Sequence, residues 1–254
     1  MRNELPRALA CSSQPLRSAF GFRSVHPQLS DHPPSAIRFY MYIPKHFEES
    51  RPQVLHELMR RHPLGVLVAT TPDGLDASHV PFETDPDVAP FGVLRCHVAR
   101  ANTLWRHLNA EAEVLAIFQG AESYVSPAWY PAKNEHGKVV PTWNYVTVHA
   151  YGRPTVIHDR LWLRSLVESL TSRHEAGRPD PWRVSDAPAE YIDKMLNAIV
   201  GIEIPITRLS GKWKISQNRS AADRQGVIEG LGQGAAASDA EMAALIRETL
   251  RNAD

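Results

Sequence analysis

The sequence is poor in cysteine, has no net charge and lacks long apolar runs. Its two cysteines, Cys11 and Cys96, lie far apart in the chain, so they indicate no disulfide framework and favour a reducing, cytoplasmic compartment. Basic and acidic residues balance at 28 each, which removes any overall electrostatic attraction to nucleic acid or to a membrane surface. No apolar stretch is long enough to span a bilayer, so we expect no membrane partner.

Several common catalytic motifs are also missing. His56-Glu57 is similar to the start of a zinc-protease helix, but the next histidine is His62, six residues on, whereas paired ligands stand four apart on one helix face. We therefore expect no metal site. Ser126 is followed by proline, and no serine stands in a glycine-flanked elbow. A glycine-rich phosphate loop is absent as well, so these patterns assign no catalytic residue.

The first 40 residues differ in composition from the rest of the chain. They hold five arginines, six serines and five prolines against two acidic residues. An arginine- and serine-rich start that is poor in acids also fits an organelle transit peptide. We interpret residues 1–40 instead as a disordered extension, with the folded part beginning at Met41.

From there on, short strands alternate with a few helices. Apolar spacing predicts helices over 49–62, after Asp159 and after Pro188. Pro205 restricts the last strand to an edge or a bulge, and the turn Thr71-Pro72-Asp73-Gly74 predicts a hairpin between the first two. The predicted strands cover 64–70, 75–82, 92–98, 113–118, part of 139–153, and 202–206.

The C-terminal quarter predicts a weak helix over 220–231, a Gly/Ala-rich linker over 230–237 and a last helix opened by a capping box at Ser238. Short strands with hairpin connections and interposed helices favour a small antiparallel barrel with helical decoration. We expect three parts: the extension over 1–40, a barrel domain with inserted helices over 41–211, and a basic turn with helices over 212–254 that packs on the barrel.

An aromatic-rich stretch is the most informative feature of the chain. Seven of the 20 aromatic residues fall between Phe118 and Tyr151, where an even distribution would place roughly three. Short neutral polar residues stand between them. Ring faces next to hydrogen-bonding groups suit a flat, amphipathic ligand, although an ordinary aromatic core explains the same composition.

Two further segments favour an anionic ligand. His97, Arg100 and Asn102 stand at the end of a predicted strand, before a short helix that Asn102 can cap. At such a position, free backbone N–H groups and a guanidinium can bind phosphate. The run from Lys212 to Arg219 combines three basic residues with an embedded tryptophan and could contact a phosphate or a nucleic-acid backbone. The alternatives are a capped surface turn and a solvated loop.

These segments occur together in one known family. The stretches are MYIPKHF (41–47), HVARAN (97–102), FQG (118–120), YVSPAWY (124–130), PTWNY (141–145), SRHE (172–175) and KWKISQNR (212–219). Their order and content resemble the PaiB-type FMN-binding negative transcriptional regulators, from Met41 to about Leu231. The resemblance implies a mainly β, α+β fold: an antiparallel split β-barrel of the FMN-binding type with C-terminal helices, paired into a homodimer with FMN in a groove between protomers.

The resemblance also implies roles for individual residues. It places the FMN phosphate near His97, Arg100 and Asn102. Backbone groups on the second hairpin strand would meet the polar edge of the flavin. Other side chains would bond the ring or the ribityl chain, cover a ring face from the same or the partner protomer, or add positive charge. The remaining candidates are Ser78, His79, Val80, Gln119, Ser126, Trp129, Trp143, Asn144, Lys214 and Arg219.

Three functions are compatible with such a protein: a flavin-responsive transcriptional repressor that contacts DNA or another regulatory protein, an FMN-dependent oxidoreductase, and a flavin-binding module without turnover. The balanced charge and the absence of a DNA-reading helix argue against sequence-specific DNA binding by this domain alone. A missing acid/base pair does not argue against an oxidoreductase, because FMN supplies the redox chemistry.

Overall fold

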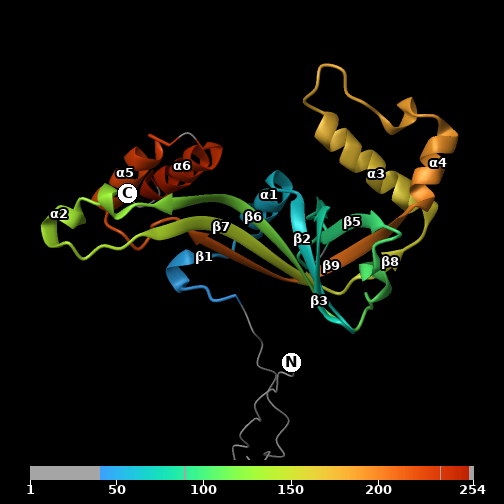
Figure 1. The fold of residues 1–254 in the computed structure, drawn as a ribbon, viewed down its shortest axis with the longest axis horizontal. Coiled ribbons are helices and arrows are strands. Elements are labelled where there is room, and N and C mark those ends of the chain that lie inside the picture. The colour runs from blue at the N-terminus through green and yellow to red at the C-terminus, as the bar shows by residue number, and fades with distance from the viewer. Residues whose placement is uncertain (1–40, 89, 235, 252–254) are drawn as a thin grey trace, which may run out of the picture. The chain divides into compact units, whose positions relative to one another are not determined.

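The framework of the protein is a nine-stranded antiparallel sheet (Figure 1). The computed structural model describes residues 41–88, 90–234 and 236–251; the predicted extension over 1–40 and Cys11 lie outside them. The main strands follow the order β3-β2-β6-β7-β9-β5-β4, and two short strands, β1 and β8, pair with β9. The strands are β1 (Glu48–Glu49), β2 (Leu64–Thr71), β3 (Gly74–Pro81), β4 (Glu83–Asp85), β5 (Val93–Ala99), β6 (Val114–Val125), β7 (Thr142–Gly152), β8 (Thr155–Ile157) and β9 (Ile199–Lys214).

Helices cover parts of this sheet. The α-helices are α1 (Pro52–Arg61), α2 (Ala132–His136), α3 (Arg160–Glu175), α4 (Ala189–Asn197), α5 (Ala221–Leu231) and α6 (Ala237–Arg251). The 3-10 turns are η1 (Lys45–Phe47), η2 (Thr103–Arg106), η3 (Pro127–Trp129) and η4 (Val184–Asp186). Figure 1 shows α5 and α6 above one end of the β6–β7 ribbon, and α3 and α4 beside the other end of the sheet. In the described residues, no helix is both long and apolar enough to cross a membrane.

The sheet curls so that its first strand approaches β5. Asn102, at the end of β5, donates a hydrogen bond from Nδ2 to Ser78 Oγ on β3, 3.1 Å away. Side chains on the inner face alternate with outer ones along each strand, and Phe82 and Phe118 meet edge to face in the interior with centroids 5.2 Å apart. The fold is therefore the mainly β split barrel with helical decoration that the sequence predicts.

Most element predictions are confirmed. The hairpin β2–β3 forms across Gly74, whose φ of 115° is a left-handed value that glycine tolerates. Asn102 caps η2 by accepting a bond from Leu104 N at 2.9 Å, and Asp159 caps α3 through Trp162 N at 2.7 Å. The last helix buries Met242 and other apolar residues as its spacing indicates.

Four predictions need correction. β6 continues seven residues beyond the predicted end at 118, across an irregularity between Gln119 and Glu122. β9 runs over 16 residues instead of the predicted five and lies in the middle of the sheet, so the edge alternative for Pro205 is wrong. The bulge alternative is confirmed by the register shift next to Gly152. The short strands β4 and β8 escape prediction because they are three residues long. α6 begins at Ala237, so Ser238 lies inside the helix and is not its cap.

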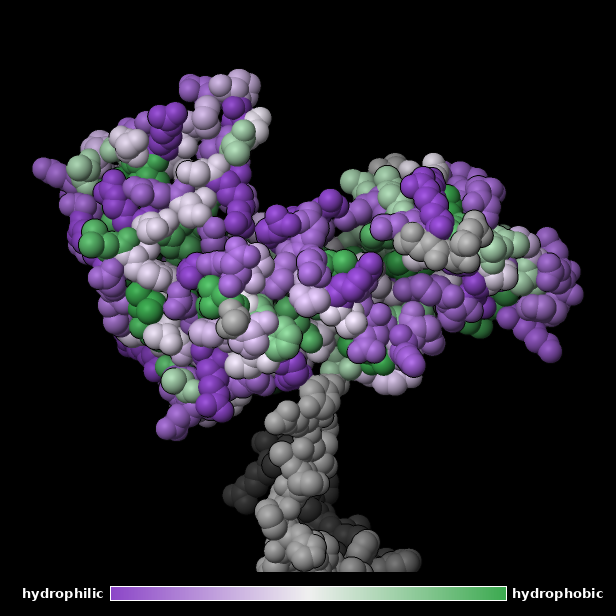
Figure 2. Space-filling view, turned by 180° about the vertical axis from the view of Figure 1, so that it is seen from behind, coloured by the Kyte–Doolittle hydropathy of each residue, from purple (hydrophilic) through white to green (hydrophobic). Residues whose placement is uncertain are grey.

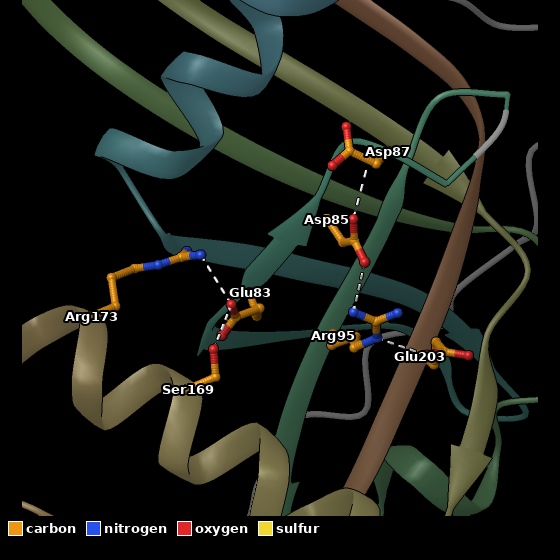
Figure 3. Close-up of polar contacts among 7 residues, drawn as sticks. All are labelled: Glu83, Asp85, Asp87, Arg95, Ser169, Arg173 and Glu203. Atoms are coloured by element: carbon orange, nitrogen blue, oxygen red, sulfur yellow. Dashed lines mark hydrogen bonds and ion pairs between the residues drawn. The ribbon is translucent and has the colours of Figure 1, made fainter.

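The helices α3 and α4 have a small core of their own. Leu163, Val184, Ile192 and Leu196 form a buried cluster apart from the main core. Polar contacts fasten α3 to the sheet: Ser169 Oγ and Arg173 Nη2 both donate to Glu83 Oε1 on β4, at 2.8 and 3.0 Å (Figure 3). Next to them, Arg95 on β5 bonds Asp85 and Glu203, so the outer face of β5 is charged.

Buried histidines predict how stability depends on pH. Burial lowers the pKa of His56, His97 and His149 below 6.5, and nearby arginines lower it further for His56 and His149. Below about pH 6.5 the unfolded chain therefore binds protons that the folded protein does not, and the free energy of unfolding falls as pH falls. We expect Tm to drop by roughly 5 °C from pH 7 to pH 5. Calorimetry of His56→Gln would show a shallower decline, with the exposed His46→Gln as the control; equal slopes for both variants would contradict this origin.

Candidate functional site

One face of the five strands β3, β2, β6, β7 and β9 is exposed, and its residues are fixed by strand register. One row across it runs from His79 through Val66, Ile117 and His149 to Ser210. The next row runs through Ala77, Val68, Leu115, Tyr151 and Arg208. Side chains of both rows are half-buried or exposed. We call these ten residues the exposed sheet face.

The opposite face of the same strands is covered. Leu55 of α1 lies against Gly211, where an added Cβ would be 2.3 Å from Leu55 Cδ2. Leu58 of the same helix approaches Gly120, and Val146, Val148 and Ala150 are buried there. On the other face, half-buried Val, Leu and Ile side chains in adjacent rows form a contiguous apolar patch. Figure 2, which views the molecule from behind, shows apolar side chains reaching the surface among polar ones.

A cationic cluster extends the exposed sheet face toward the far end of β9. Lys212 and Lys214 alternate with buried Trp213 and so point to this face, and Arg219 follows in the next loop. Lys212 Nζ donates to Tyr42 O at 2.9 Å and lies 5.3 Å from the Tyr145 ring centroid. In the described part of the chain, no carboxylate lies within 4.0 Å of these three cationic groups. None of the three therefore forms an ion pair with a described carboxylate.

The electrostatics of Lys214 follow from this arrangement. Burial lowers the pKa of its ammonium group, and the positive charges of Lys212 and Arg219 lower that pKa further. The group donates to Thr142 Oγ1 and to Trp143 O, which are neutral acceptors. An anion beside Lys214 would reverse the effect of the neighbouring cations and favour the charged form.

Aromatic rings border the cationic cluster. Trp143 is 54% exposed, and its ring meets Tyr124 edge to face at 6.0 Å. Arg219 Cζ lies 4.8 Å from the Tyr130 ring centroid. The exposed ring of Trp143, beside cations that form no ion pair among the described residues, is suited to a flat ligand that carries a negative charge.

The first group of sequence-predicted residues lies where β3 approaches β5. Ser78 and Asn102 bond each other, whereas Val80 is buried and offers only its backbone. His79 is exposed and belongs to the exposed sheet face. Arg100 uses two of its guanidinium nitrogens on the carbonyls of Asn197 and Ile199, at 2.8 and 2.9 Å. In this structure Arg100 joins the end of α4 to the start of β9.

His97 lies elsewhere than the sequence pattern suggests. Its position is on the outer side of β5, beneath α3, and not at the open end of the strand. Burial lowers the pKa of its imidazole, and its Nδ1 has no hydrogen-bond partner among the described residues. A neutral imidazole in this place adds no positive charge for a phosphate.

The second group surrounds the far ends of β6, β7 and β9. Buried Asn144 donates to Ser216 Oγ at 2.9 Å, exposed Gln119 bonds Glu122, and Ser126 caps η3 through Ala128 N. Trp129 packs on α5 so closely that a Cβ at Gly230 would lie 2.2 Å from its ring. This packing leaves Trp143, and not Trp129, as the ring available to a ligand.

The two groups lie far apart in one protomer. His79 and Lys214 stand four strands apart across the sheet, about 19 Å, and four residues apart along it, about 14 Å. Both positions nevertheless belong to the same exposed surface. At this separation within the sheet, His79 and Lys214 of one protomer do not reach the same small ligand.

Sequence analysis missed some residues of this surface. They are Tyr42, Tyr145, Tyr151 and Arg208, which contribute rings or charge to it, whereas Lys212 already belonged to the predicted basic run over 212–219. Strand alternation was the available signal: within 139–153, Tyr145, Thr147, His149 and Tyr151 alternate with buried apolar residues. Arg208 stacks on Tyr151 with Cζ 3.4 Å from the ring centroid, a contact between β7 and β9 that depends on register.

Comparison with known proteins identifies the family. Residues 41–208 match the family described as "Putative FMN-binding domain". The chain belongs to this FMN-binding, PaiB-like family. It is 36% identical to an uncharacterized protein of Aspergillus fumigatus over 75% of this chain and 90% of the relative. It is 30% identical to "Protease synthase and sporulation protein PAI 2" of Bacillus subtilis, over 83% of this chain and 99% of that protein.

Solved structures support the fold. The flavocytochrome Anf3 from Azotobacter vinelandii superimposes with a TM-score of 0.50 at 14% identity, over 66% of this chain and 69% of that chain. At such identity the likeness concerns the architecture alone. As a member of the family, the chain is an FMN-binding protein with a split-barrel fold.

The residues present fit FMN. Its phosphate is an anion and its isoalloxazine is a flat ring. The far end of β9 offers three cations that form no ion pair among the described residues, beside exposed Trp143 and half-buried Tyr145. His79 and the Ser78–Asn102 pair offer polar groups at the other end of the surface. Trp129 and Val80 contribute packing and backbone, because their side chains are occupied within the protomer.

Proposed function

We propose that the protein is a homodimeric, FMN-binding transcriptional regulator of the PaiB type. Two copies would face each other through the exposed sheet face, and each FMN would lie between the Lys212–Lys214–Arg219 cluster of one protomer and the β3 end of the partner. Bound FMN supplies reversible one- or two-electron redox chemistry. The chain's own residues would hold the phosphate, cover the ring and exclude water from it.

The separation of the predicted FMN residues carries this proposal. His79 and Lys214 lie about 19 Å apart across the sheet and about 14 Å along it, yet share one surface. Pairing of that surface with a second copy would also bury the half-exposed rows of Val66, Val68, Leu115 and Ile117. Isologous pairing of an apolar patch is the commonest route to a soluble dimer.

The regulatory part of the proposal rests on the Bacillus relative, whose name connects it with protease synthesis and sporulation. Cations gathered at one end of β9 give a protein of zero net charge a local site for a phosphate. Repression would require either DNA contact or a regulatory partner.

One preparation of the purified protein tests cofactor, assembly and activity together. We expect a yellow dimer: a flavin spectrum with one FMN per chain, and twice the chain mass by light scattering. A salt-sensitive shift of promoter DNA without flavin reduction would support the regulator. A colourless monomer that takes up no FMN would refute the proposal.

An FMN-dependent oxidoreductase is the second candidate. A cavity of about 440 Å³ beneath α3, next to Pro81 of β3, gives a small molecule a place close to the β3 end of the proposed flavin site. Rapid bleaching of the flavin by NADH or NADPH without oxygen, and no DNA shift, would favour this function over the regulator.

A further inference from the structure

The chain turns sharply where β9 ends, between two members of the cationic cluster. Lys214 is the last residue of the strand, and Arg219 lies beyond the turn. Ser216 stands between them with a φ of 66°, the one positive φ at a non-glycine position within the described ranges. A left-handed backbone is sterically costly for serine, so it persists only where its surroundings impose it.

A buried side-chain pair imposes this conformation on Ser216. Asn144 of β7 is completely buried, and its Nδ2 donates to Ser216 Oγ at 2.9 Å. Strand alternation continued beyond β9 would direct Ser216 to the exposed side of the sheet, together with Lys212 and Lys214. The left-handed backbone instead turns the hydroxyl to the covered side, where Asn144 and Val146 are both buried.

The same pair keeps Asn144 away from the surface. Both polar atoms of its amide lie near the Ser216 hydroxyl, Nδ2 at 2.9 Å and Oδ1 at 3.4 Å from Oγ. An amide enclosed in this way has no exposed atom to offer to a flavin ring or ribityl chain. Its position therefore favours a role through Ser216 over the direct flavin contact that the family resemblance implies.

The turn determines where Arg219 lies relative to Lys214. Arg219 N donates to Ser216 O at 3.0 Å, which closes the turn. The Arg219 guanidinium then lies with Cζ 4.8 Å from the Tyr130 ring centroid, and its charge is close enough to Lys214 to lower the pKa of that ammonium group. The two cations come from opposite sides of one turn, so the shape of the turn decides whether a single anion can meet both.

We propose that Asn144 and Ser216 are positioning residues for the FMN phosphate: their buried pair holds the turn so that Lys214 and Arg219 meet one phosphate group. Neither Asn144 nor Ser216 touches the cofactor. Charged donors bind a phosphate well only when they converge on it, and convergence depends on the hydrogen bonds that hold the donors in place. This role rests on the proposed function, because it takes the cationic cluster as the phosphate site.

Riboflavin and FMN test the proposal, because they share the ring and the ribityl chain and differ in the phosphate. Fluorescence titration of the flavin-free full chain gives a Kd for each, and the ratio of the two measures what the phosphate contributes. Ser216→Ala removes the hydroxyl and keeps the steric cost of the left-handed backbone, so the turn should relax and Arg219 should move away. We expect FMN affinity to fall about tenfold and riboflavin affinity to change by less than about twofold.

A matched variant separates the backbone of the turn from the loss of a hydroxyl. Ser216→Gly also lacks the hydroxyl but adopts a left-handed backbone without strain, so it should bind FMN about fivefold more tightly than Ser216→Ala. Ser169→Ala removes a hydroxyl on α3 that bonds Glu83, and it should leave both affinities unchanged. Asn144→Leu keeps the side-chain volume and should lose FMN selectively, as Ser216→Ala does; should it fail to fold, the Ser216 variants decide.

A double-mutant cycle shows whether Ser216 acts through Arg219. In an Arg219→Met background, Ser216→Ala should cause no further loss of FMN affinity, because the group that it positions is already absent. An undiminished loss in that background would overturn the proposal. Equal losses of FMN and riboflavin in Ser216→Ala would overturn it as well, since they indicate a structural role alone.

The cationic variants distinguish this inference from the proposed function. If Arg219→Met and Lys214→Met lower the preference for FMN over riboflavin while Ser216→Ala does not, the positioning role is wrong and the phosphate site stands. If neither cationic variant alters the preference, the cluster does not bind the phosphate, and the flavin placement of the proposed function fails together with this role.

Discussion

Replacement of Lys214 by glutamate is expected to abolish FMN retention. The substitution places a carboxylate beside Lys212 and Arg219, which form no ion pair with a described carboxylate, where an anionic cofactor would have to approach. Lys214→Met keeps the length of the side chain and removes only its charge. Because a hydrogen bond to a charged group contributes about 1.5–3 kcal/mol, we expect Lys214→Met to weaken FMN binding roughly 10- to 100-fold. Fluorescence titration of flavin-free protein measures both.

The pH dependence distinguishes a charge effect from a folding defect. Since burial and two cations lower the pKa of Lys214 in the free protein, its charge is lost at a lower pH than that of an ordinary lysine. FMN affinity should therefore begin to decline at a pH below the one at which an ordinary lysine loses its charge. Lys214→Met should lack this decline. Lys194→Glu, an equal charge reversal at an exposed position of α4, is the control and should bind FMN normally. Full retention of FMN by Lys214→Glu would exclude the cationic cluster from the site.

The sequence predicted the barrel well because its signals are local. Gly74 determines a turn only a few residues long, and Asn102 caps a helix that begins at the next residue. The β2–β3 hairpin and η2 therefore form at the predicted positions. The predicted lengths of β6 and β9 were wrong for a non-local reason: the second half of each strand is held by its pairing with β7, which is distant in sequence from β9. A proline that indicates a strand end in isolation is tolerated at Pro205 because the neighbouring register shifts there.

The candidate site was predictable in composition but not in arrangement. Lys214 and Trp143 were recognised from their side-chain chemistry, as a cation and an aromatic ring. The strand register that places Lys214 opposite Tyr145 could not be predicted, because it depends on pairing between distant segments. His97 shows the converse. Its place at the end of a strand suggested a phosphate contact, and the packing of α3 over β5 instead puts it beneath that helix.

Replacement of Ile117 by aspartate is expected to convert the dimer into a monomer. Ile117 lies in the middle of the exposed sheet face, between Val66 and His149, and is half-buried in one protomer. Facing a second copy, each protomer would bury a carboxylate without a partner, which costs several kcal/mol per ion. An affinity loss of about 1,000-fold or more should follow for the dimer. Light scattering measures the mass, and the visible spectrum should show FMN lost along with the partner.

A substitution outside the face separates dimer loss from unfolding. Leu161→Asp introduces the same charge at a position of α3 that is 77% exposed, and it should remain a yellow dimer. Ile117→Asp should keep the far-ultraviolet circular dichroism of the parent, since its side chain is already half-solvated in a single protomer. A monomer that still binds one FMN per chain would show that one protomer suffices, because cofactor and dimer would then be independent. A dimer of unchanged affinity would place the interface elsewhere and leave the apolar rows of the sheet without the partner proposed for them.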